Sequence, residues 1–359
     1  MKIVAAFDSF KESMSAYEAG VAVQRATDHE VIIKPMADGG EGTLEAIKSF
    51  LKGDIHNLEV HGPFNKTKAS LLIADKIAII ECAQACGLDL VANDKRNGSK
   101  TTTRGIGDMV RYAYDHGARE FIITLGGSST NDGGAGFLSS LGVEFYNKDG
   151  QFIPTGETLS SIEDIRVPQF NDMSFKGICD VNNPLLGKQG ATMVFGAQKG
   201  VKDLELQEKA MTHYANKSAE VLHKDERNYP GAGAAGGLGF AIVAYLNGEL
   251  VGGFDEVARL SHLEDAIREA DLVFTGEGSM DHQTLMGKTP QGVLELAKKY
   301  NKKVVGFAGK VEDKETLLEA GFYDIRCINH QEAPLHELLK KGASNLEQEV
   351  REYLKHYEI

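Results

Sequence analysis

The stretch FIITLGGSSTNDGGAGFL, from Phe121 to Leu138, constrains the fold of this chain more than any other. It opens with a short apolar run, which is typical of a buried parallel strand. Glycines and hydroxyl side chains follow, and an apolar face resumes at Phe137. This order suits anion binding in an α/β protein, because backbone N–H groups and the positive end of a helix dipole then face the ligand. It equally suits a tight turn that only lets a helix pack closely on a sheet, and the segment alone does not decide between the two.

The rest of the chain favours an α/β fold with interruptions. Strand-like runs at residues 2–7 and 30–34 each end in an acidic turn, which is glycine-rich after the second run, and a helix-like segment follows each turn. Open α/β sheets bind ligands outside the carboxyl ends of their strands, so both turns are candidates for a ligand site. From about residue 58, and again from residue 142, short alternating runs predict antiparallel hairpins. A strand-like run at 271–275 restores the α/β order. We therefore expect an α/β domain interrupted by two insertions.

Length, charge and cysteine content narrow the class of protein. The 359 residues exceed the usual size of one domain. The formal net charge of −13 argues against nucleic acid or an anionic membrane as the main partner. The four cysteines fit neither a zinc ribbon nor a CxxC redox pair, which favours reduced thiols. The longest mainly apolar stretch, 238–246, is far shorter than the roughly 20 residues of a membrane span. The apolar run at residues 3–7 is too short for a signal sequence, so we expect a cytoplasmic protein.

Two glycine-rich motifs imitate nucleotide-binding signatures without the context that those signatures need. Gly231–Gly236 matches G-x-G-x-x-G, and Asp255 follows at the spacing of a dinucleotide site, but polar residues precede the motif where a buried strand is required. Gly287–Thr289 matches the end of a P-loop, but His282 replaces the first glycine of that motif. We therefore expect neither an NAD site nor a P-loop. The first motif is better interpreted as a helix start that faces a ligand. In the second, Thr289 is expected to cap a helix, and Lys288 can still hold a phosphate.

Acidic side chains gather in the glycine-rich turns near the ends of the expected strands. Helix capping and turn formation explain any single one of them, but we do not expect all of them to be structural. Several could hold Mg²⁺, which prefers one or two carboxylates together with water and phosphate oxygens. One could accept a proton from an alcohol. These acids are Asp8, Asp38, Glu41, Asp132, Asp180, Glu277 and Asp281.

Cations lie in the same kinds of turn, where they would suit an anionic substrate and phosphates. They are Lys11, Arg104, Lys199, Lys288 and Lys310. Most lysines are simply solvated, so we single out only Lys11 and Lys288. The sequence shows no Ser-His-Asp arrangement, no HExxH motif and no metal-binding His/Cys cluster.

Several of these stretches together carry a resemblance to a known family. They are FDSFKESMSA (Phe7–Ala16), PMADGGEGT (Pro35–Thr43), LGGSSTNDGGAGFL (Leu125–Leu138), CDVNNPLLGKQGAT (Cys179–Thr192), FGAQKG (Phe195–Gly200), PGAGAAGGLG (Pro230–Gly239) and TGEGSMDHQTLMGKTPQGV (Thr275–Val293). In this order they span the whole chain, and they resemble the bacterial glycerate kinases of glycerate and glucarate catabolism.

The resemblance implies both a fold and an activity. The implied fold is a flavodoxin-like parallel-sheet α/β domain with a second α/β domain inserted into it. We assign residues 1–57, 99–140 and 251–359 to the flavodoxin-like domain, and residues 58–98 and 141–250 to the inserted domain. The implied activity is ATP-dependent phosphorylation of glycerate with Mg²⁺. Members of the family are generally taken to phosphorylate the 2-hydroxyl of (R)-glycerate, and the 3-hydroxyl is the other candidate.

The roles of single residues are our hypotheses from the chemistry of the turns. We expect Asp180 or Asp8 to be the base that takes the hydroxyl proton, and Lys11 and Lys288 to neutralise the phosphoryl group or the carboxylate. Phosphate and substrate contacts are expected from Ser9, Gly39, Gly40, Gly127, Ser128, Ser129, Thr130, Asn131, Asn182, Gly233, Gly236 and Gly276. Metal ligands are expected among Asp38, Glu41, Asp132, Glu277 and Asp281.

Two alternatives stay open at this point. A kinase for another small hydroxy acid would share every phosphate-binding feature, because glycine-rich turns do not report the acceptor. A non-catalytic metabolite-binding protein is the second alternative, although the lysines and carboxylates in the turns argue against it. In each case the expected partners are small molecules, here glycerate and ATP, and not nucleic acid or a membrane.

Overall fold

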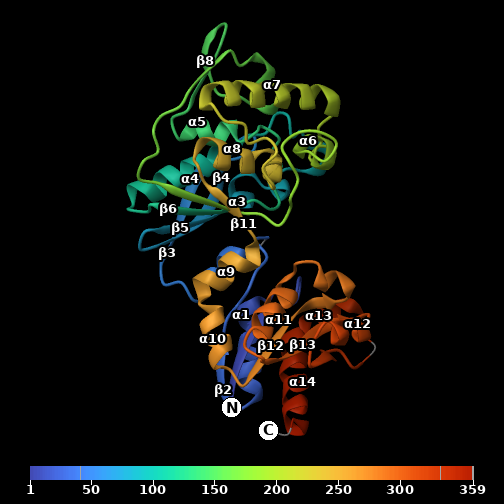
Figure 1. The fold of residues 1–359 in the computed structure, drawn as a ribbon. Coiled ribbons are helices and arrows are strands. Elements are labelled where there is room, and N and C mark those ends of the chain that lie inside the picture. Colours follow the sequence, from blue (N-terminus) through green and yellow to red (C-terminus); the bar gives the residue numbers. More distant parts are fainter. Residues whose placement is uncertain (41, 332, 358–359) are drawn as a thin grey trace. The chain divides into compact units, whose positions relative to one another are not determined.

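The chain folds into two units, each built around its own main sheet (Figure 1). The structure is a computed structural model, and it describes residues 1–40, 42–331 and 333–357. Unit 1 comprises Met1–Asp38, Glu45–Lys52 and Gly253–Ile359, and unit 2 comprises Gly39–Leu44 and Gly53–Gly252. Glu41 lies outside the described residues, so its expected role as a metal ligand stays a prediction.

Unit 1 contains a five-stranded sheet in which all neighbouring strands are parallel. Its strands are β1 (Lys2–Phe7), β2 (Glu30–Ile33), β12 (Leu272–Met280), β13 (Lys303–Val311) and β14 (Asp324–Cys327). The order across the sheet is β2-β1-β12-β13-β14. Counted along the chain within this unit, that is the flavodoxin-like order 2-1-3-4-5. The expected flavodoxin-like fold with an inserted α/β unit is therefore confirmed.

Helices cover both faces of this sheet. Helices α1 (Ala16–Ala26) and α14 (Gly342–His356) pack on the face that holds Ile3 and Phe7 of β1 (Figure 1). Val4, which points to the other face, is also buried, as expected for a strand covered on both sides. A capping box begins α1, because the Ser15 hydroxyl accepts from the N–H of Glu18 and the Glu18 carboxylate accepts from the N–H of Ser15. The other helices of this region are α2 (Thr43–Lys48), α9 (Gly253–Ser261), α10 (Leu263–Glu269), η5 (His282–Leu285), α11 (Thr289–Lys298), α12 (Lys314–Glu319) and α13 (Leu335–Lys340).

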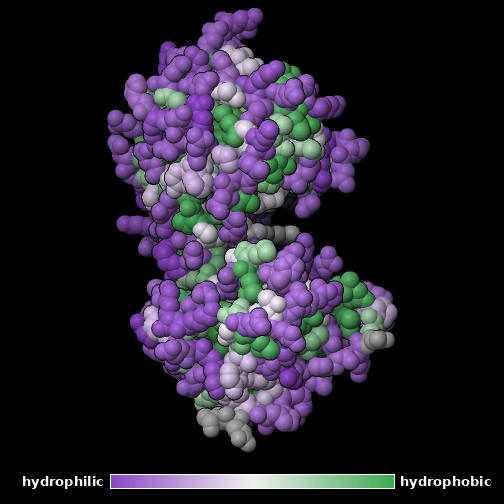
Figure 2. Space-filling view, turned by 45° about the vertical axis from the view of Figure 1, so that its right-hand side comes forward, coloured by the Kyte–Doolittle hydropathy of each residue, from purple (hydrophilic) through white to green (hydrophobic). Residues whose placement is uncertain are grey.

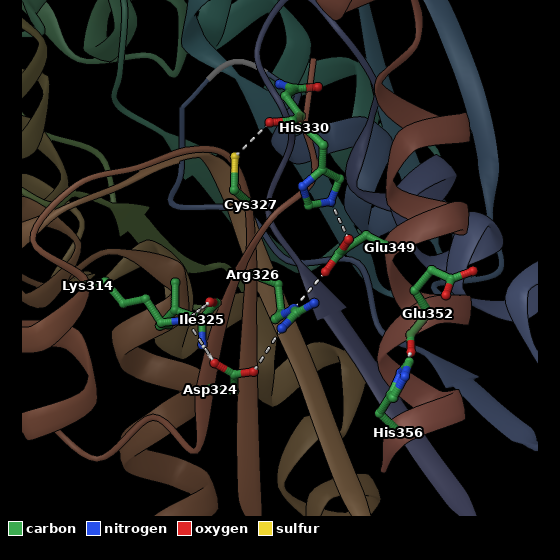
Figure 3. Close-up of polar contacts among 10 residues, drawn as sticks. Lys314, Asp324, Ile325, Arg326, Cys327, His330, Glu349, Glu352 and His356 are labelled. Carbon is green, nitrogen blue, oxygen red and sulfur yellow. Dashed lines mark hydrogen bonds and ion pairs between the residues drawn. The ribbon is translucent and has the colours of Figure 1, made fainter. Parts of the chain in front are cut away.

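A buried carboxylate joins α14 to the edge strand β14 (Figure 3). Glu349 accepts a hydrogen bond from Nε of Arg326 at 2.6 Å and contacts Nε2 of His330 at 2.5 Å. Arg326 also lies 3.6 Å from Asp324, whose carboxylate is 3.0 Å from Nζ of Lys314. The Glu349 side chain is only 4% exposed. This network therefore holds α14 against β14 from inside the unit.

Unit 2 contains a six-stranded mixed sheet in the order β11-β10-β6-β5-β4-β3. The strands from β11 to β5 are parallel, and β5, β4 and β3 are antiparallel. A separate antiparallel sheet has the order β8-β7-β9. The strands are β3 (Asp54–His61), β4 (Lys66–Ala74), β5 (Ile77–Glu81), β6 (Glu120–Thr124), β7 (Glu144–Asn147), β8 (Gly150–Phe152), β9 (Asp164–Arg166), β10 (Ser174–Ile178) and β11 (Glu249–Val251).

The core of unit 2 lies between the larger sheet and the helices around it. Phe121 stacks on Phe175 with 5.1 Å between ring centroids, and Phe137 meets Phe175 edge-on at 6.4 Å. The α-helices of this unit are α3 (Cys82–Cys86), α4 (Arg104–Asp115), α5 (Ala135–Ser140), α6 (Ala191–Phe195), α7 (Leu204–Leu222) and α8 (Leu238–Tyr245). The short 3-10 helices are η1 (Leu88–Leu90), η2 (Asn93–Lys95), η3 (Gly156–Ser161) and η4 (Ala234–Gly236).

Residues 99–140 belong to unit 2, which corrects their expected place in the flavodoxin-like domain. They contain β6, whose Phe121 pairs with Ala78 of β5 on one side and Phe175 of β10 on the other. A buried parallel strand has the same sequence signature in either sheet, so only its partners decide where it lies. Shorter segments that also fall in unit 2 are 39–44, 53–57 and 251–252.

Candidate active site

Unit 1 has a topological switch point between β1 and β12. From β1 the chain first adds β2 on one side and later adds β12 on the other. Open α/β sheets bind ligands at such a point, in the crevice outside the carboxyl ends of the strands. Asp8 is the first residue beyond β1, and its N–H donates to the carbonyl oxygen of Gly276 in β12 at 3.0 Å. The sequence therefore places a carboxylate at the position where this fold binds ligands.

Asp8 is a partly buried carboxylate with hydrogen-bond donors at both oxygens. Its Oδ1 accepts from the N–H of Ser9 at 2.7 Å, and its Oδ2 accepts from the hydroxyl of Thr289 at 2.6 Å. Burial raises the pKa of Asp8 to about 6, and the nearby Asp38 carboxylate adds to the rise. The bonds from Thr289 and Ser9 oppose that rise in pKa. Such a carboxylate is ionised at neutral pH and still basic enough to take a proton from a substrate.

Glu277 and Lys288 form a second polar group beside Asp8. Glu277 follows in β12, and its Oε2 lies 3.7 Å from Nζ of Lys288. Its Oε1 accepts from the hydroxyl of Thr284 at 2.9 Å. Burial raises the pKa of Glu277, the Lys288 ammonium opposes that rise, and the charge of Asp8 adds to it. The two carboxylates are therefore close enough to feel each other's charge, with one lysine placed to balance them.

The turn after β1 presents Lys11 at the same edge. Phe10 and Met14 pair through backbone hydrogen bonds across this turn, and both are buried. Between them, Glu12 has a φ of +61°, a left-handed conformation that is uncommon for a residue other than glycine. A Cβ built at Gly278 of β12 would lie 3.7 Å from the backbone nitrogen of Lys11. The exposed Lys11 side chain thus starts beside the strand that carries Glu277.

Asp38 is the expected metal ligand that the structure brings near Asp8. Its side chain is exposed, and its charge raises the pKa of Asp8. Across residues 1–40, 42–331 and 333–357, no cluster of three or more His, Cys, Asp or Glu side chains is arranged to hold a metal ion. Mg²⁺ does not need such a cluster, because one or two carboxylates can share it with water and phosphate oxygens. Asp38 and Glu277 each interact electrostatically with Asp8, and their joint role as metal ligands stays a prediction.

Two other expected metal ligands hold the backbone. Asp132 is fully buried, and its Oδ2 accepts from the N–H and hydroxyl of Thr103 at 2.9 and 2.8 Å and from the N–H of Gly136 at 3.3 Å. Its Oδ1 accepts from the N–H of Gly134 at 3.1 Å. Burial raises the pKa of Asp132. Asp281 is the N-cap of η5, where its side chain bonds the backbone two residues on. These bonds give both acids a structural role, and their expected role as metal ligands stays a prediction, because an acid in a glycine-rich turn looks the same whether it binds metal or caps a helix.

Unit 2 presents the Gly126–Thr130 turn at the carboxyl end of β6. Gly126 and Gly127 are exposed, whereas Ser128, Ser129 and Thr130 are buried. The N–H and the hydroxyl of Ser129 both bond the carbonyl oxygen of Cys86, at 2.7 and 2.9 Å, and so anchor the turn to α3. A Cβ built at Gly126 would lie 3.5 Å from the carbonyl oxygen of Gly39 and 3.6 Å from Cα of Gly40. The expected contact residues of these two segments are therefore neighbours.

Asp180 and Asn182 follow β10, the strand next to β6. Thr124 at the end of β6 pairs with Ile178 at the end of β10. Because the two strands are parallel, the residues that follow them leave the sheet at the same edge. The side chains of Asp180 and Asn182 are exposed there. The structure thus brings both to the edge that carries the Gly126–Thr130 turn.

The motif Pro230–Gly239 packs closely against neighbouring backbone. Each residue from Gly231 to Gly239 is buried. A Cβ at Gly236 would lie 2.0 Å from the carbonyl oxygen of Thr130, and one at Gly233 would lie 2.3 Å from that of Pro184. Glycine is required at both positions because backbones meet there. The structure gives Gly233 and Gly236 a packing role, and their expected phosphate contact stays a prediction.

Asn131 and Gly276 also have packing roles, and their expected substrate contacts stay predictions. Asn131 is fully buried, and its side-chain amide donates to the hydroxyl of Thr192 at 3.2 Å. A Cβ at Gly276 would lie 1.9 Å from the carbonyl oxygen of Phe307. Gly276 therefore lets β12 and β13 approach, while its own carbonyl holds Asp8 as described above.

Sequence reasoning missed two residues that the structure places in these sites. Thr289 is expected to cap α11, but Lys288 occupies the N-cap position and the Thr289 hydroxyl bonds Asp8. Lys199 is set aside as solvated, yet it is only 4% exposed. The only sequence feature that marks Lys199 as a candidate site residue is its position between two glycines in FGAQKG, and this feature does not indicate whether the side chain is buried.

The described residues contain no helix with the length and apolar character needed to cross a bilayer. Figure 2 shows hydrophilic residues over most of the visible surface, with smaller apolar patches among them.

Comparisons with known proteins extend over nearly the whole chain. The glycerate kinase family model matches residues 3–358. The chain is 42% identical over 328 residues to glycerate 2-kinase of Escherichia coli (strain K12), covering 87% of this chain and 86% of that protein. It is 39% identical to glycerate kinase of Bacillus subtilis (strain 168), covering 98% and 96%. The crystal structure of a candidate glycerate kinase 2 from Salmonella typhimurium LT2 matches with a TM-score of 0.90 at 38% identity, covering 99% of this chain and 97% of that one. The chain therefore belongs to the glycerate kinase family of ATP-using enzymes, as its motifs predicted.

Proposed function

We propose that this protein is a glycerate 2-kinase, which transfers the γ-phosphoryl group of ATP to the 2-hydroxyl of (R)-glycerate and releases ADP. Family membership supports the substrate and the use of ATP, and one relative is named a 2-kinase. The observation that carries the mechanism is Asp8, a carboxylate at the switch point with a pKa of about 6. A cytoplasmic location belongs to the proposal, and it is supported by four cysteines that are all free.

Asp8 acts as the general base. It takes the proton of the 2-hydroxyl while that oxygen forms its bond to the γ-phosphorus, and the bond to the β–γ bridging oxygen breaks to release ADP. Hydrogen bonds from Ser9 and Thr289 hold its two oxygens in place. Asp180, the other candidate base, is an exposed side chain of unit 2, so Asp8 is the better supported choice.

Lys288 and Lys11 supply positive charge for the transferring phosphoryl group. Phosphoryl transfer depends mainly on positioning and on neutralising charge that spreads over the phosphate oxygens. Glu277 holds Lys288 at 3.7 Å, and Thr284 fixes Glu277 in turn. Lys11 comes from the turn after β1, beside the same strand.

Asp38 and Glu277 are the residues of unit 1 that would hold Mg²⁺. The exposed Asp38 carboxylate and the Glu277 carboxylate both interact electrostatically with Asp8, which supports a shared location. When bound, Mg²⁺ would neutralise charge on the β- and γ-phosphate oxygens.

The proposal is tested by ADP release from the purified protein with Mg-ATP and (R)-glycerate, with enolase alone present to detect the product. ADP release with an immediate enolase signal supports a glycerate 2-kinase, because enolase consumes 2-phosphoglycerate directly. A signal that appears only after a mutase is added would move the acceptor to the 3-hydroxyl. Faster turnover with tartronate or glucarate than with glycerate would contradict the substrate assignment.

A further inference from the structure

Lys199 is a buried cation beneath the Gly126–Thr130 turn of unit 2. Only 4% of the residue is exposed. Its Nζ donates to the hydroxyl oxygen of Ser128 and to the carbonyl oxygen of Thr130, both at 2.8 Å. Burying an ammonium group is costly, and that cost is normally met by an anionic partner. The position of Lys199 under this turn therefore calls for a functional explanation.

In unit 2, no described carboxylate is placed to form an ion pair with Lys199. The titratable groups that face it are the thiols of Cys82 and Cys86 in α3 and the carboxyl group of Asp132. Asp132 is already bonded to four donors of its own surroundings. The pKa of the Cys82 thiol is well raised by its hydrogen bond with Cys86 and by burial, so it stays neutral. Burial lowers the pKa of Lys199 to about 8, which is expected of an ammonium that lacks an anion.

In the Gly126–Thr130 turn, carbonyl oxygens accept hydrogen bonds, whereas several backbone N–H groups have no acceptor among the described residues. The carbonyl oxygen of Gly126 accepts from the Cys82 thiol at 3.2 Å, and that of Gly127 accepts from the N–H of Leu88 at 2.8 Å. For the N–H groups of Gly126, Gly127 and Ser128, the described part of the chain supplies no acceptor. Gly126 and Gly127 are also exposed. Successive unpartnered N–H groups next to a fixed cation are an arrangement that binds anions.

We propose that the Gly126–Ser128 backbone binds the carboxylate of the hydroxy-acid substrate, with Lys199 as the positioning residue beneath it. This inference rests on the proposed function, because it assigns the substrate carboxylate to one part of the proposed enzyme. Lys199 acts through Ser128 and Thr130, whose oxygens it holds, and through its charge. It fixes the turn so that the N–H groups point at the ligand.

A carboxylate fits this turn better than a phosphate of Mg-ATP does. Phosphates that carry Mg²⁺ are best placed near carboxylates that share the metal, and in unit 1 Asp38 and Glu277 provide them. Near the turn, Asp132 is fully buried and already accepts hydrogen bonds from the backbone, and Asp180 is a single exposed acid at the same edge of the sheet. A single buried ammonium with two or three N–H groups matches the single charge and two oxygens of a carboxylate.

The test is a kinetic comparison of Lys199→Met, Lys199→Arg and Lys202→Met. Lys202 is an exposed lysine of the same loop, so its replacement serves as the matched control. We expect Lys199→Met to raise KM for glycerate by about tenfold or more, the size of one charge-assisted interaction, with KM for ATP changed less than about twofold. Lys199→Arg should recover most of the affinity, and Lys202→Met should match the wild type.

The pH dependence of glycerate binding separates a charge effect from a merely structural one. In the wild type, KM for glycerate should rise above about pH 8, where Lys199 loses its proton. In Lys199→Arg that rise should be absent, because guanidinium stays charged over this range. If Lys199→Met does not fold, Ser128→Ala removes one acceptor of Nζ and should raise KM for glycerate in the same sense.

Three results would overturn this inference. One is a rise in KM for ATP without a rise for glycerate, which would assign the turn to a nucleotide phosphate. The second is an unchanged KM for both substrates in Lys199→Met. The third is equal binding of tartronate by wild type and Lys199→Met in calorimetry, which tests a carboxylate site even if the wild type does not phosphorylate glycerate. If the wild type shows no glycerate turnover, the proposed function is contradicted. If Lys199→Met then still binds tartronate more weakly than the wild type, the carboxylate site is supported.

Discussion

At the scale of single residues, Asp8 combines a cost in stability with a gain in basicity. Burial and the charge of Asp38 raise its pKa to about 6, while Thr289 and Ser9 hold its oxygens. A catalytic base needs a pKa near the working pH and a fixed orientation. The same two properties make specific predictions for substitutions at Asp8 and Thr289.

Thr289→Val should move the acidic limb of the pH–rate profile to higher pH. The Thr289 hydroxyl lowers the pKa of Asp8 by bonding its ionised form, and valine keeps the shape of the side chain without that bond. We expect kcat of the wild type to fall as pH drops below about 6. In the variant the fall should begin at higher pH, by about half a unit to one unit. An acidic limb at the same pH in both proteins would contradict the role of Asp8 as the titrating base.

Asp8→Asn should stabilise unit 1 at neutral pH. The folded-state pKa of Asp8 is raised from 3.8 to about 6, so ionisation costs more in the folded protein than in the unfolded chain. Stability is therefore lost as pH rises from about 4 to about 6, and the neutral amide avoids this loss. We expect a gain in the free energy of unfolding of about 1–3 kcal/mol at pH 7 that shrinks toward pH 4. Urea unfolding at both pH values measures it, and a variant less stable than wild type at pH 7 would contradict the account.

At the scale of elements, the attachment of α14 to β14 depends on the buried Glu349 carboxylate (Figure 3). Glu349→Gln should lower the free energy of unfolding by about 1–3 kcal/mol, because the charge-assisted bond from Arg326 is weakened and the buried negative charge that faces Arg326 and His330 is removed. Glu352→Gln on the same helix is the matched control, since that side chain is 46% exposed. Its effect should stay within about 0.5 kcal/mol. Equal urea midpoints for the two variants would show that the network does not hold α14.

At the scale of the whole molecule, the sequence predicted what depends on local patterns. Apolar runs followed by polar turns located β1 and β6, and the motifs around Asp8 and Lys288 led to the site of unit 1. The pattern could not assign residues 99–140 to a sheet, because the strand partners of β6 are set by tertiary pairing. It also could not distinguish Asp132, which caps the backbone, from an acid that faces a ligand.

Burial was the other property that local patterns did not reveal. The residues that flank Lys199 are typical of an exposed loop, yet the Lys199 side chain is buried against α3 and the Gly126–Thr130 turn. The glycines of Pro230–Gly239 match a ligand-binding motif, yet Gly236 packs against the backbone of Thr130 and Gly233 against that of Pro184. Both outcomes depend on residues distant in the sequence.

The most direct test of the central claim is the turnover of Asp8→Asn with Mg-ATP and (R)-glycerate. If Asp8 takes the hydroxyl proton, kcat should fall by about 10²–10⁴-fold, the usual contribution of a general base. Binding of Mg-ATP, measured by calorimetry, should stay within about twofold of the wild type, because the substitution removes a proton acceptor and keeps the shape of the site. Turnover near the wild-type value would contradict the account and leave Asp180 as the candidate base.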